Sequence, residues 1–179
     1  TIKNGTADDA YSGFGTGLEW YGQLNCAMAV RLKTDDIAAT KIEVGFTDAT
    51  DDGGAVNDLD GATFTATDCA VWAFDTDDST DNWKLASTPD GGTSDTVTDT
   101  GFAPAADTYE TLIIALEDTA AHFYRLDSNG YQTYKASHTT GPSKDVALTP
   151  WVFTQTREGS DEKTVTVDFI RVWQRRTVS

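Results

Sequence analysis

Hydrophobic and polar residues alternate in short stretches along this chain, and the alternation has the period of a β-strand. The clearest stretch is TVTVDFIRVWQ at residues 164–174, where apolar and polar residues alternate up to Phe169. Beyond that point Ile170 and Val172 place apolar groups on the opposite face as well. Because a strand that is apolar on both faces is typical of the middle of a sheet, we expect this stretch to be a central strand.

Eight further stretches have a strand-like pattern and are separated by turn residues. They are 24–32, 41–47, 70–75, 83–87, 110–117, 122–126, 131–136 and 151–156. Asn129-Gly130, between two of them, indicates a β-hairpin. No segment has helical periodicity over helical length, and residues 88–100, rich in Gly, Asp, Thr and Ser, are expected as a loop. The pattern predicts an all-β sandwich or barrel, as one domain over 1–179 with 1–20 as an extended N-terminal arm.

The charge balance narrows the range of partners. Thirteen basic residues against 29 acidic residues give a net charge of −16 and a pI near 4.2. Such a surface repels nucleic acid and anionic membranes, and no apolar run approaches the roughly 20 residues of a membrane span. The acidity fits either an ordinary solvated surface or adaptation to a salty environment. The chain starts without Met and without a charged-then-apolar leader, so Thr1 could follow a processing cut or a shortened sequence, and both alternatives stay open.

The two cysteines lie in apolar stretches and leave two alternatives open. Cys26 and Cys69 could pair across a sandwich, but a domain of this size needs no disulfide, and we expect two buried free thiols. No cysteine or histidine cluster indicates zinc.

Residues for catalysis are not apparent in the pattern. Glycoside hydrolysis on a sandwich needs two carboxylates facing one cleft, which on a strand calls for acids at i, i+2 and i+4. No stretch has that spacing, and the acids of the predicted strands are expected to face solvent; they are Glu43, Glu110, Glu117 and Asp168. His122 is expected on a strand surface and His138 in a Ser/Thr-rich loop, and neither has a Ser, Cys or acid at a sequence spacing that suggests a triad. We therefore predict no catalytic, cofactor-binding or metal-binding residue, and no enzyme.

Calcium and sugar binding stay open as weaker alternatives. The Asp-rich segments 48–60 and 75–82 supply oxygen ligands for Ca²⁺, although neither has the spacing of an EF-hand loop. Aromatic side chains on the surface could stack on sugars, and the candidates are Trp20, Tyr21, Trp72, Trp83, Tyr131, Tyr134 and Trp151. Large aromatics in a sandwich are mostly core, which is the expectation for Trp72 and Trp173.

Several segments occur together in a familiar order. They are CAVWAFDT (69–76), DNWKLAS (81–87), GFAP (101–104), DTYETLII (107–114), HFYRL (122–126), Asn129-Gly130 and VDFIRVWQ (167–174). Over residues 24–176 this order resembles the concanavalin A-like lectin/glucanase jelly-roll domains of tailed-virus and prophage structural proteins. The resemblance implies two antiparallel sheets packed as a jelly-roll sandwich.

The resemblance also implies a function. It points to a virion protein on the capsid exterior, a decoration protein or head fibre, that stabilises the shell or mediates adhesion. The implied partners are the major capsid protein or other virion proteins, further copies of the chain in a homo-oligomer, and glycans. The alternative is a carbohydrate-binding module, viral or extracellular. A polysaccharide hydrolase or lyase ranks third, because this chain lacks the acidic triplet of the cleaving relatives.

Overall fold

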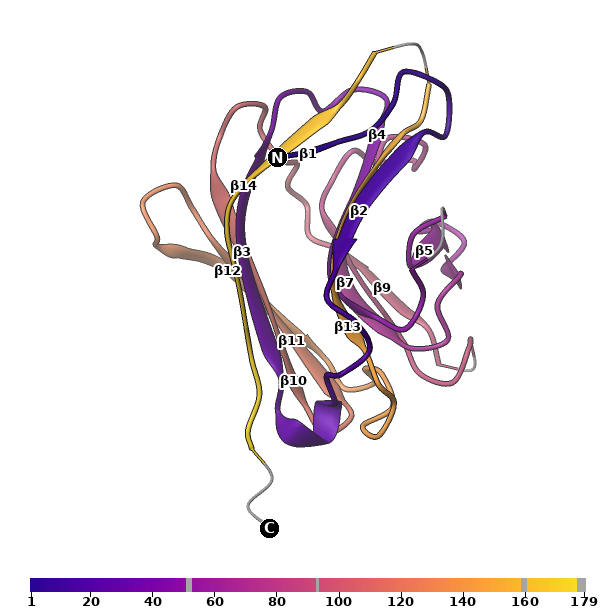
Figure 1. Cartoon of the computed structure of the whole chain (residues 1–179), viewed down its shortest axis with the longest axis vertical. Coiled ribbons are helices and arrows are strands. Elements are labelled where there is room, and N and C mark those ends of the chain that lie inside the picture. Colours follow the sequence, from indigo (N-terminus) through magenta and orange to yellow (C-terminus); the bar gives the residue numbers. More distant parts are fainter. Residues whose placement is uncertain (51–52, 93, 159–160, 177–179) are drawn as a thin grey trace.

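A computed structural model describes residues 1–50, 53–92, 94–158 and 161–176 of the protein (Figure 1). The described residues form fourteen strands and one 3-10 helix. In chain order these are β1 (Ile2–Lys3), β2 (Tyr11–Gly15), η1 (Gly22–Leu24), β3 (Ala27–Thr34), β4 (Thr40–Thr47), β5 (Val56–Asp58), β6 (Thr63–Phe64), β7 (Cys69–Asp75), β8 (Lys84–Thr88), β9 (Thr96–Asp99), β10 (Glu110–Glu117), β11 (Ala120–Leu126), β12 (Gln132–His138), β13 (Thr149–Thr156) and β14 (Thr164–Trp173).

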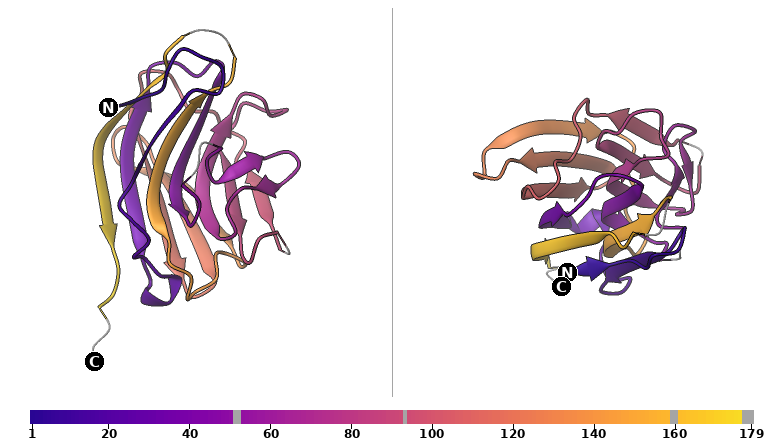
Figure 2. Two further views of the ribbon diagram at one scale, coloured as in Figure 1. Left: turned by 45° about the vertical axis from the view of Figure 1, so that its right-hand side comes forward. Right: turned by 90° about the horizontal axis from the view of Figure 1, so that it is seen from above.

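Two six-stranded antiparallel sheets pack face to face (Figures 1 and 2). Sheet A has the order β1-β14-β3-β10-β11-β12, and sheet B has the order β2-β13-β4-β7-β8-β9. The short β5–β6 hairpin lies on the outer side of sheet B, away from sheet A (Figure 1). The predicted all-β jelly-roll sandwich is confirmed. No helix among the described residues is long and apolar enough to span a membrane.

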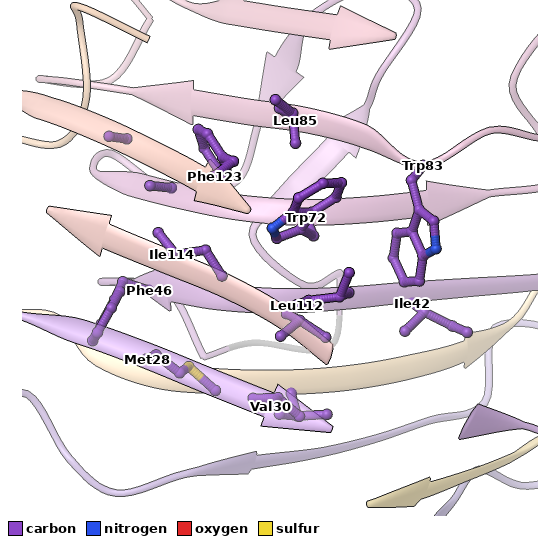
Figure 3. Packing of buried hydrophobic residues seen from close by; sticks show 14 of the residues in the cluster. Met28, Val30, Ile42, Phe46, Trp72, Trp83, Leu85, Leu112, Ile114 and Phe123 are labelled. Atoms are coloured by element: carbon purple, nitrogen blue, oxygen red, sulfur yellow. The ribbon is translucent and has the colours of Figure 1, made fainter. Parts of the chain in front are cut away.

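The core lies between the two sheets and follows from strand alternation. On β3, Met28 and Val30 point inward and are fully buried, whereas Arg31 on the same strand points outward. Trp72 of β7 lies at the centre of the core, with its ring 6.0 Å from Phe123 and 6.3 Å from Trp83 in edge-to-face contacts (Figure 3). Each large apolar side chain buried in this way contributes about 1.5–3 kcal/mol to the free energy of folding.

Strand β14 lies near the edge of sheet A, so the expectation of a central strand was wrong. Its partner β1 covers only Thr164 and Val165. A β-bulge between Val167 and Phe169 inserts one extra residue, Asp168, into the pairing with β3. The bulge shifts the alternation, so that the apolar residues before and after it both face the core. A bulge therefore produced the pattern that resembles a strand apolar on both faces.

Two segments without predicted strands contribute strands to the sheets. Residues 1–20, expected as an extended arm, supply β1 and β2, which pair with β14 and β13. Residues 88–100, expected as a loop, contain β9, which pairs with β8; position 93 lies outside the described residues. The predicted hairpin at Asn129-Gly130 is confirmed, because β11 and β12 pair on either side of it.

The two cysteines are buried free thiols, as expected. Cys26 lies in the core between the sheets, whereas Cys69 belongs to a second apolar cluster on the outer face of sheet B. Burial raises the pKa of Cys26 to about 12 and the pKa of Cys69 well above its usual value. Because the two thiols lie in different clusters, they have no route to a disulfide without unfolding.

Candidate functional site

The outer face of sheet B is partly covered by the chain between β4 and β7. Val56 and Leu59 from this segment pack on Val71 and Ala86 of the sheet, and together they form a second, smaller apolar cluster. Strand β7 is consequently buried on both faces, with all seven residues inaccessible to solvent. The β5–β6 hairpin therefore divides the outer face of sheet B into grooves along its sides.

A buried ion pair attaches this segment to the sheet. Lys41 and Glu43, two residues apart on β4, both point to the outer face and are 1% and 0% exposed, with Nζ 3.1 Å from Oε1. The Glu43 carboxylate also accepts hydrogen bonds from the backbone N–H groups of Ala55 (2.7 Å) and Val56 (3.0 Å). Lys41 donates to the carbonyl of Gly53 at 2.9 Å and to that of Val56. Each charge therefore satisfies backbone groups of the covering segment.

Beside this pair lies a cavity of about 310 Å³, which we call the hairpin groove. Its lining residues come from four separate parts of the chain and are Asp9, Lys41, Gly53, Asn57, Gln155 and Arg157. Gln155 of β13 is 5% exposed, and its Nε2 donates to Asp9 Oδ1 at 3.2 Å. Its Oε1 is buried and has no hydrogen-bond donor among the described residues. Because an unpaired buried acceptor costs about 1–3 kcal/mol, a donor that reached this oxygen would stabilise the site.

An aromatic row borders the hairpin groove. Tyr11 pairs with Gln155 in the β2–β13 register, so the two side chains lie side by side on the outer face. The Tyr11 ring stacks on Phe153 at 6.1 Å, and Phe153 stacks on Trp151 at 5.6 Å. Trp151 and Phe153 are buried, whereas Tyr11 is 51% exposed. Tyr11 therefore offers the outer ring face of a fixed stack to solvent.

Arg157 connects the hairpin groove to a second, more acidic cavity of about 370 Å³ that it shares with Asp75 and Asp77. Its Nε donates to Asp75 Oδ1 at 2.8 Å and lies 3.5 Å from Asp77 Oδ2. Burial alone would lower the pKa of Arg157, but the bonds to Asp75 more than offset this and raise it. For the carboxyl group of Asp77, burial acts in the opposite direction and raises the pKa. The guanidinium thus stays charged and holds the acidic side chains in fixed positions.

On the other side of the hairpin, Lys84 forms ion pairs with two aspartates of the adjoining surface. Its Nζ lies 2.5 Å from Asp60 Oδ1 and 3.2 Å from Asp78 Oδ2. The hydrogen bond from Lys84 lowers the pKa of Asp60 to about 2, whereas burial raises the pKa of Asp78 to about 6 despite the same lysine. These opposite shifts show how strongly the depth of an acid decides its proton affinity on this face.

The four acids considered for catalysis are not brought together. The expectation that they face solvent is confirmed for Glu117 and Asp168, whose side chains are 71% and 47% exposed. It was wrong for Glu43 and for Glu110, which is 4% exposed and bonded to Arg125 and to the indole N–H of Trp83. A sheet face appears solvent-facing in sequence when the segment that covers it comes from elsewhere in the chain.

The two histidines also lie far from the hairpin groove. His122 is on the outer face of sheet A as expected, with Nδ1 2.8 Å from Ser137 Oγ. His138 was expected in a loop but is the last residue of β12 and is 5% exposed. Ser87 Oγ and Thr98 Oγ1 lie 2.8 and 3.1 Å from its two ring nitrogens. Burial lowers the pKa of His138 to about 4, and its shell is that of a neutral structural imidazole.

Most of the aromatic candidates are core residues. Trp72 and Trp83 are fully buried, Trp151 is 5% exposed, and Trp20, Tyr21 and Tyr134 are half-buried, whereas Tyr131 is 73% exposed. Trp173 was expected in the core but is 50% exposed, because the β14 bulge turns it outward. Tyr11, which the sequence pattern did not single out, is the exposed aromatic at the hairpin groove. The available signal for its edge strand was that Tyr11, Gly13 and Gly15 are two residues apart, the spacing of residues that share one face of a strand.

The Asp-rich segments do not form a metal site among the described residues, where no group of three acidic, His or Cys side chains could hold an ion. In segment 48–60, Asp48 accepts from the backbone N–H groups of Thr67 and Asp68, both at 3.1 Å; positions 51–52 lie outside the described residues. In segment 75–82, Asp75 is bonded to Arg157. These carboxylates are occupied by the protein itself.

Comparisons with solved structures identify the fold. The exoplasmic/lumenal domain of VIP36, in a form bound to Ca²⁺ and Man3GlcNAc, superposes with a TM-score of 0.64 at 10% identity, over 99% of this chain and 79% of that one. A β-1,3-glucanase from Mycobacterium marinum gives 0.59 at 12% identity, over 92% and 68%. The CBM2 module of the evolved Dit of Lactobacillus casei BL23 phage J-1 gives 0.53 at 10% identity, over 99% and 78%.

These neighbours share the concanavalin A-like lectin/glucanase jelly roll, and at such identities the likeness concerns the fold alone. No protein-family model and no curated protein sequence matches the chain. What the site does must therefore come from its own residues.

Proposed function

We propose that this chain is a non-catalytic glycan-binding module that works on the exterior of a virus particle. The observation that carries the binding proposal is the Gln155 side chain, which lines the hairpin groove beside the exposed ring of Tyr11 and whose buried Oε1 has no donor among the described residues. A sugar presents both a hydroxyl to such an acceptor and an apolar ring face to such an aromatic. Small-ligand sites typically combine a few convergent polar groups with an apolar surface in this way.

The charges of the hairpin groove favour an uncharged sugar. Lys41 and Arg157 bring positive charge to its lining, and Asp9, whose side chain is 70% exposed, brings negative charge. Asn57 adds an exposed amide that can both donate and accept. The neighbouring cavity adds further carboxylates, including those of Asp75 and Asp77. An anionic sugar would meet repulsion from those carboxylates, whereas the hydroxyl groups of an uncharged sugar can pair with the polar side chains of Asp9, Asn57 and Gln155.

The proposal of a non-enzymatic role rests on the state of the carboxylates. Glu43 is the acid at the centre of the outer face of sheet B, and two backbone N–H groups, the Trp151 indole and Lys41 occupy its oxygens. A carboxylate held in this manner has neither an open lone pair nor access to a substrate proton. Release of reducing ends from a panel of β-glucans or alginates by the purified protein would contradict this part of the proposal.

The virion setting is supported by the resemblance of the sequence to virion jelly-roll domains and by the likeness of the fold to a phage Dit module. A decoration protein or head fibre would use the hairpin groove for adhesion, and its contacts with the major capsid protein and with further copies of itself would stabilise the shell. The net charge of −16 suits a particle surface that must not aggregate. The alternative setting is a secreted module. Purified particles that lack the chain in mass spectrometry would exclude the virion setting.

The binding test is a glycan array followed by isothermal titration with the best uncharged oligosaccharide. Tyr11→Ala removes the ring face, and Gln155→Met removes the acceptor while keeping side-chain length; each is expected to weaken binding at least about tenfold. Tyr131→Ala is the matched control, since Tyr131 is 73% exposed in the β11–β12 turn. Thermal melting of each variant separates lost binding from lost folding. An array without any hit, or Tyr11→Ala binding as the wild type does, would refute the hairpin groove as the site.

A further inference from the structure

The outer face of sheet A carries a groove whose shape follows from small residues in register. Across the sheet, Trp173 of β14 pairs with Ala27 of β3, Ala27 pairs with Ala115 of β10, and Ala115 pairs with His122 of β11. Paired residues project on the same side of a sheet, so two alanines form a low floor between the larger Trp173 and His122. The result is a cavity of about 400 Å³, which we call the Trp173 groove.

The β14 bulge decides that Trp173 lines this groove. Without the extra residue at Asp168, the alternation that places Val165 and Val167 in the core would point Trp173 inward. With it, Phe169, Arg171 and Trp173 project outward. Trp173 is 50% exposed and is the most exposed of the five tryptophans. A bulge of this kind re-aims side chains, and bulges are over-represented next to functional sites.

Two basic side chains without a carboxylate partner among the described residues line the same groove. Nine of the thirteen basic side chains form an ion pair with a carboxylate of the described residues. The four that do not are Lys135, Arg171, Arg175 and Arg176. Lys135 and Arg175 line the Trp173 groove, Arg171 is exposed on the same face of β14, and Arg176 follows in sequence. In a chain of net charge −16, two bases without a carboxylate partner that line one groove with an exposed indole indicate an anionic ligand.

The other charged and polar groups at the groove leave this balance positive. Glu117 is the acid in the lining, and its Oε2 lies 3.6 Å from His122 Nε2. Asn25, with its amide oxygen turned toward Arg175, accepts from both terminal guanidinium nitrogens at 3.2 Å and so orients that side chain. The Lys135 ammonium lies 5.5 Å from the centre of the Tyr124 ring. Both cations are therefore held at the groove without a carboxylate partner.

We propose that the Trp173 groove binds an anionic oligosaccharide, one that carries carboxylate or sulfate groups. A sugar ring stacks on the exposed indole above the alanine floor, and Lys135 and Arg175 pair with the acidic groups. This site lies on the opposite sheet from the hairpin groove and differs from it in charge, so it does not depend on the function proposed above. Its ligand is of a kind that the carboxylates of the cavity beside the hairpin groove repel.

The test is isothermal titration of the wild-type protein, at low and at physiological salt, with three hexasaccharides of equal length. One carries uronate groups, one carries sulfate groups, and one is uncharged. We expect the uronate, the sulfate or both to bind, with affinity falling as salt rises, and no binding of the uncharged sugar at this groove. Binding should also protect Trp173 fluorescence from quenching by acrylamide, because Trp173 is the most exposed tryptophan, whereas Trp20 is half-buried and the other three are buried.

Variants assign the binding to the groove. Trp173→Ala and Lys135→Gln are each expected to weaken binding of the anionic sugar about tenfold. Lys3→Gln removes the same charge from an exposed side chain at the opposite end of β14 and should leave the affinity within about twofold. Tyr11→Ala should also have no effect, which separates this site from the hairpin groove.

Three results would overturn the proposal. The uncharged sugar could protect Trp173 from acrylamide as strongly as the anionic ones do, Lys135→Gln could match the wild type, or light scattering could show that a second copy of the chain covers Trp173 and that Trp173→Ala dissociates it.

Discussion

Substitution of Glu43 by Gln tests the role of the buried ion pair on sheet B. The change keeps the shape of the side chain but removes its charge, and it replaces one acceptor oxygen with an NH2 group. Lys41, at 1% exposure, is left as a buried charge without its partner. At least one of the N–H donors of Ala55, Val56 and Trp151 then faces a donor instead of an acceptor. Breaking a buried pair in this way costs about 3–5 kcal/mol.

That loss is large against the whole stability of the domain. A native domain has a free energy of unfolding of about 5–15 kcal/mol, so the variant would lose roughly a fifth of it or more. Urea unfolding at pH 7, followed by tryptophan fluorescence, measures the change. Lys41→Met should be similarly destabilising, because it leaves the Glu43 charge buried.

The double variant Lys41→Met/Glu43→Gln distinguishes coupling from two separate losses. With neither charge present, its cost should fall below the sum of the single costs by about 2 kcal/mol. Lys3→Gln breaks the exposed pair with Glu162 and should leave the unfolding midpoint unchanged. A Glu43→Gln loss below about 1 kcal/mol, or strict additivity in the double variant, would refute the reasoning that this pair holds the covering segment on the sheet.

Three further predictions concern pH, salt and close packing. Burial lowers the pKa of His138 to about 4, so as the pH falls the unfolded state takes up the proton before the folded state does. His138 should therefore reduce the free energy of unfolding as the pH falls from 6.5 to 4, by about 3 kcal/mol in total. Comparing the wild type with His138→Gln over that range isolates the effect from Asp78, whose raised pKa acts in the opposite direction; parallel pH profiles would contradict it. Because a net charge of −16 repels itself, the melting temperature should rise between about 0.05 and 1 M NaCl, and a flat salt profile would count against this. Gly45→Ala should cost about 3 kcal/mol in urea unfolding, because its Cβ would lie 2.7 Å from Val71 Cα and would overlap the carbonyl of Ala70; a wild-type midpoint would show that the strands can separate.

The local pattern of apolar and polar residues was sufficient to predict the long strands. It failed for the short strands, whose formation depends on the strand they pair with. Strands β4, β7, β10 and β13 were predicted within a residue or two of their ends, because their apolar alternation is strong. The short strands β1, β2, β5, β6 and β9 were not predicted, since two to five residues carry too little alternation to be distinguished from loop. They form because a neighbouring strand offers unpaired backbone groups.

The candidate sites were less predictable than the fold. The lining of the hairpin groove comes from residues 9, 41, 53, 57 and 155–157, which no linear motif connects. The lining of the Trp173 groove depends on a β-bulge that cannot be predicted from a single sequence. In both grooves the signal that reveals the site is spatial, an unpaired acceptor in one and a group of unpaired cations in the other.

The sequence by itself determined that this protein is all-β, that its surface is strongly acidic, and that its cysteines lie in apolar stretches. These properties follow from alternation, composition and apolar context, which act locally. Only the tertiary structure decided which faces are open. The covering segment buried Glu43 and Lys41 on a face that looked solvent-facing, and one extra residue at Asp168 turned Trp173 from the core to the surface. Alternation fixes which residues share a face, but the pairing of distant segments decides whether that face meets protein or water.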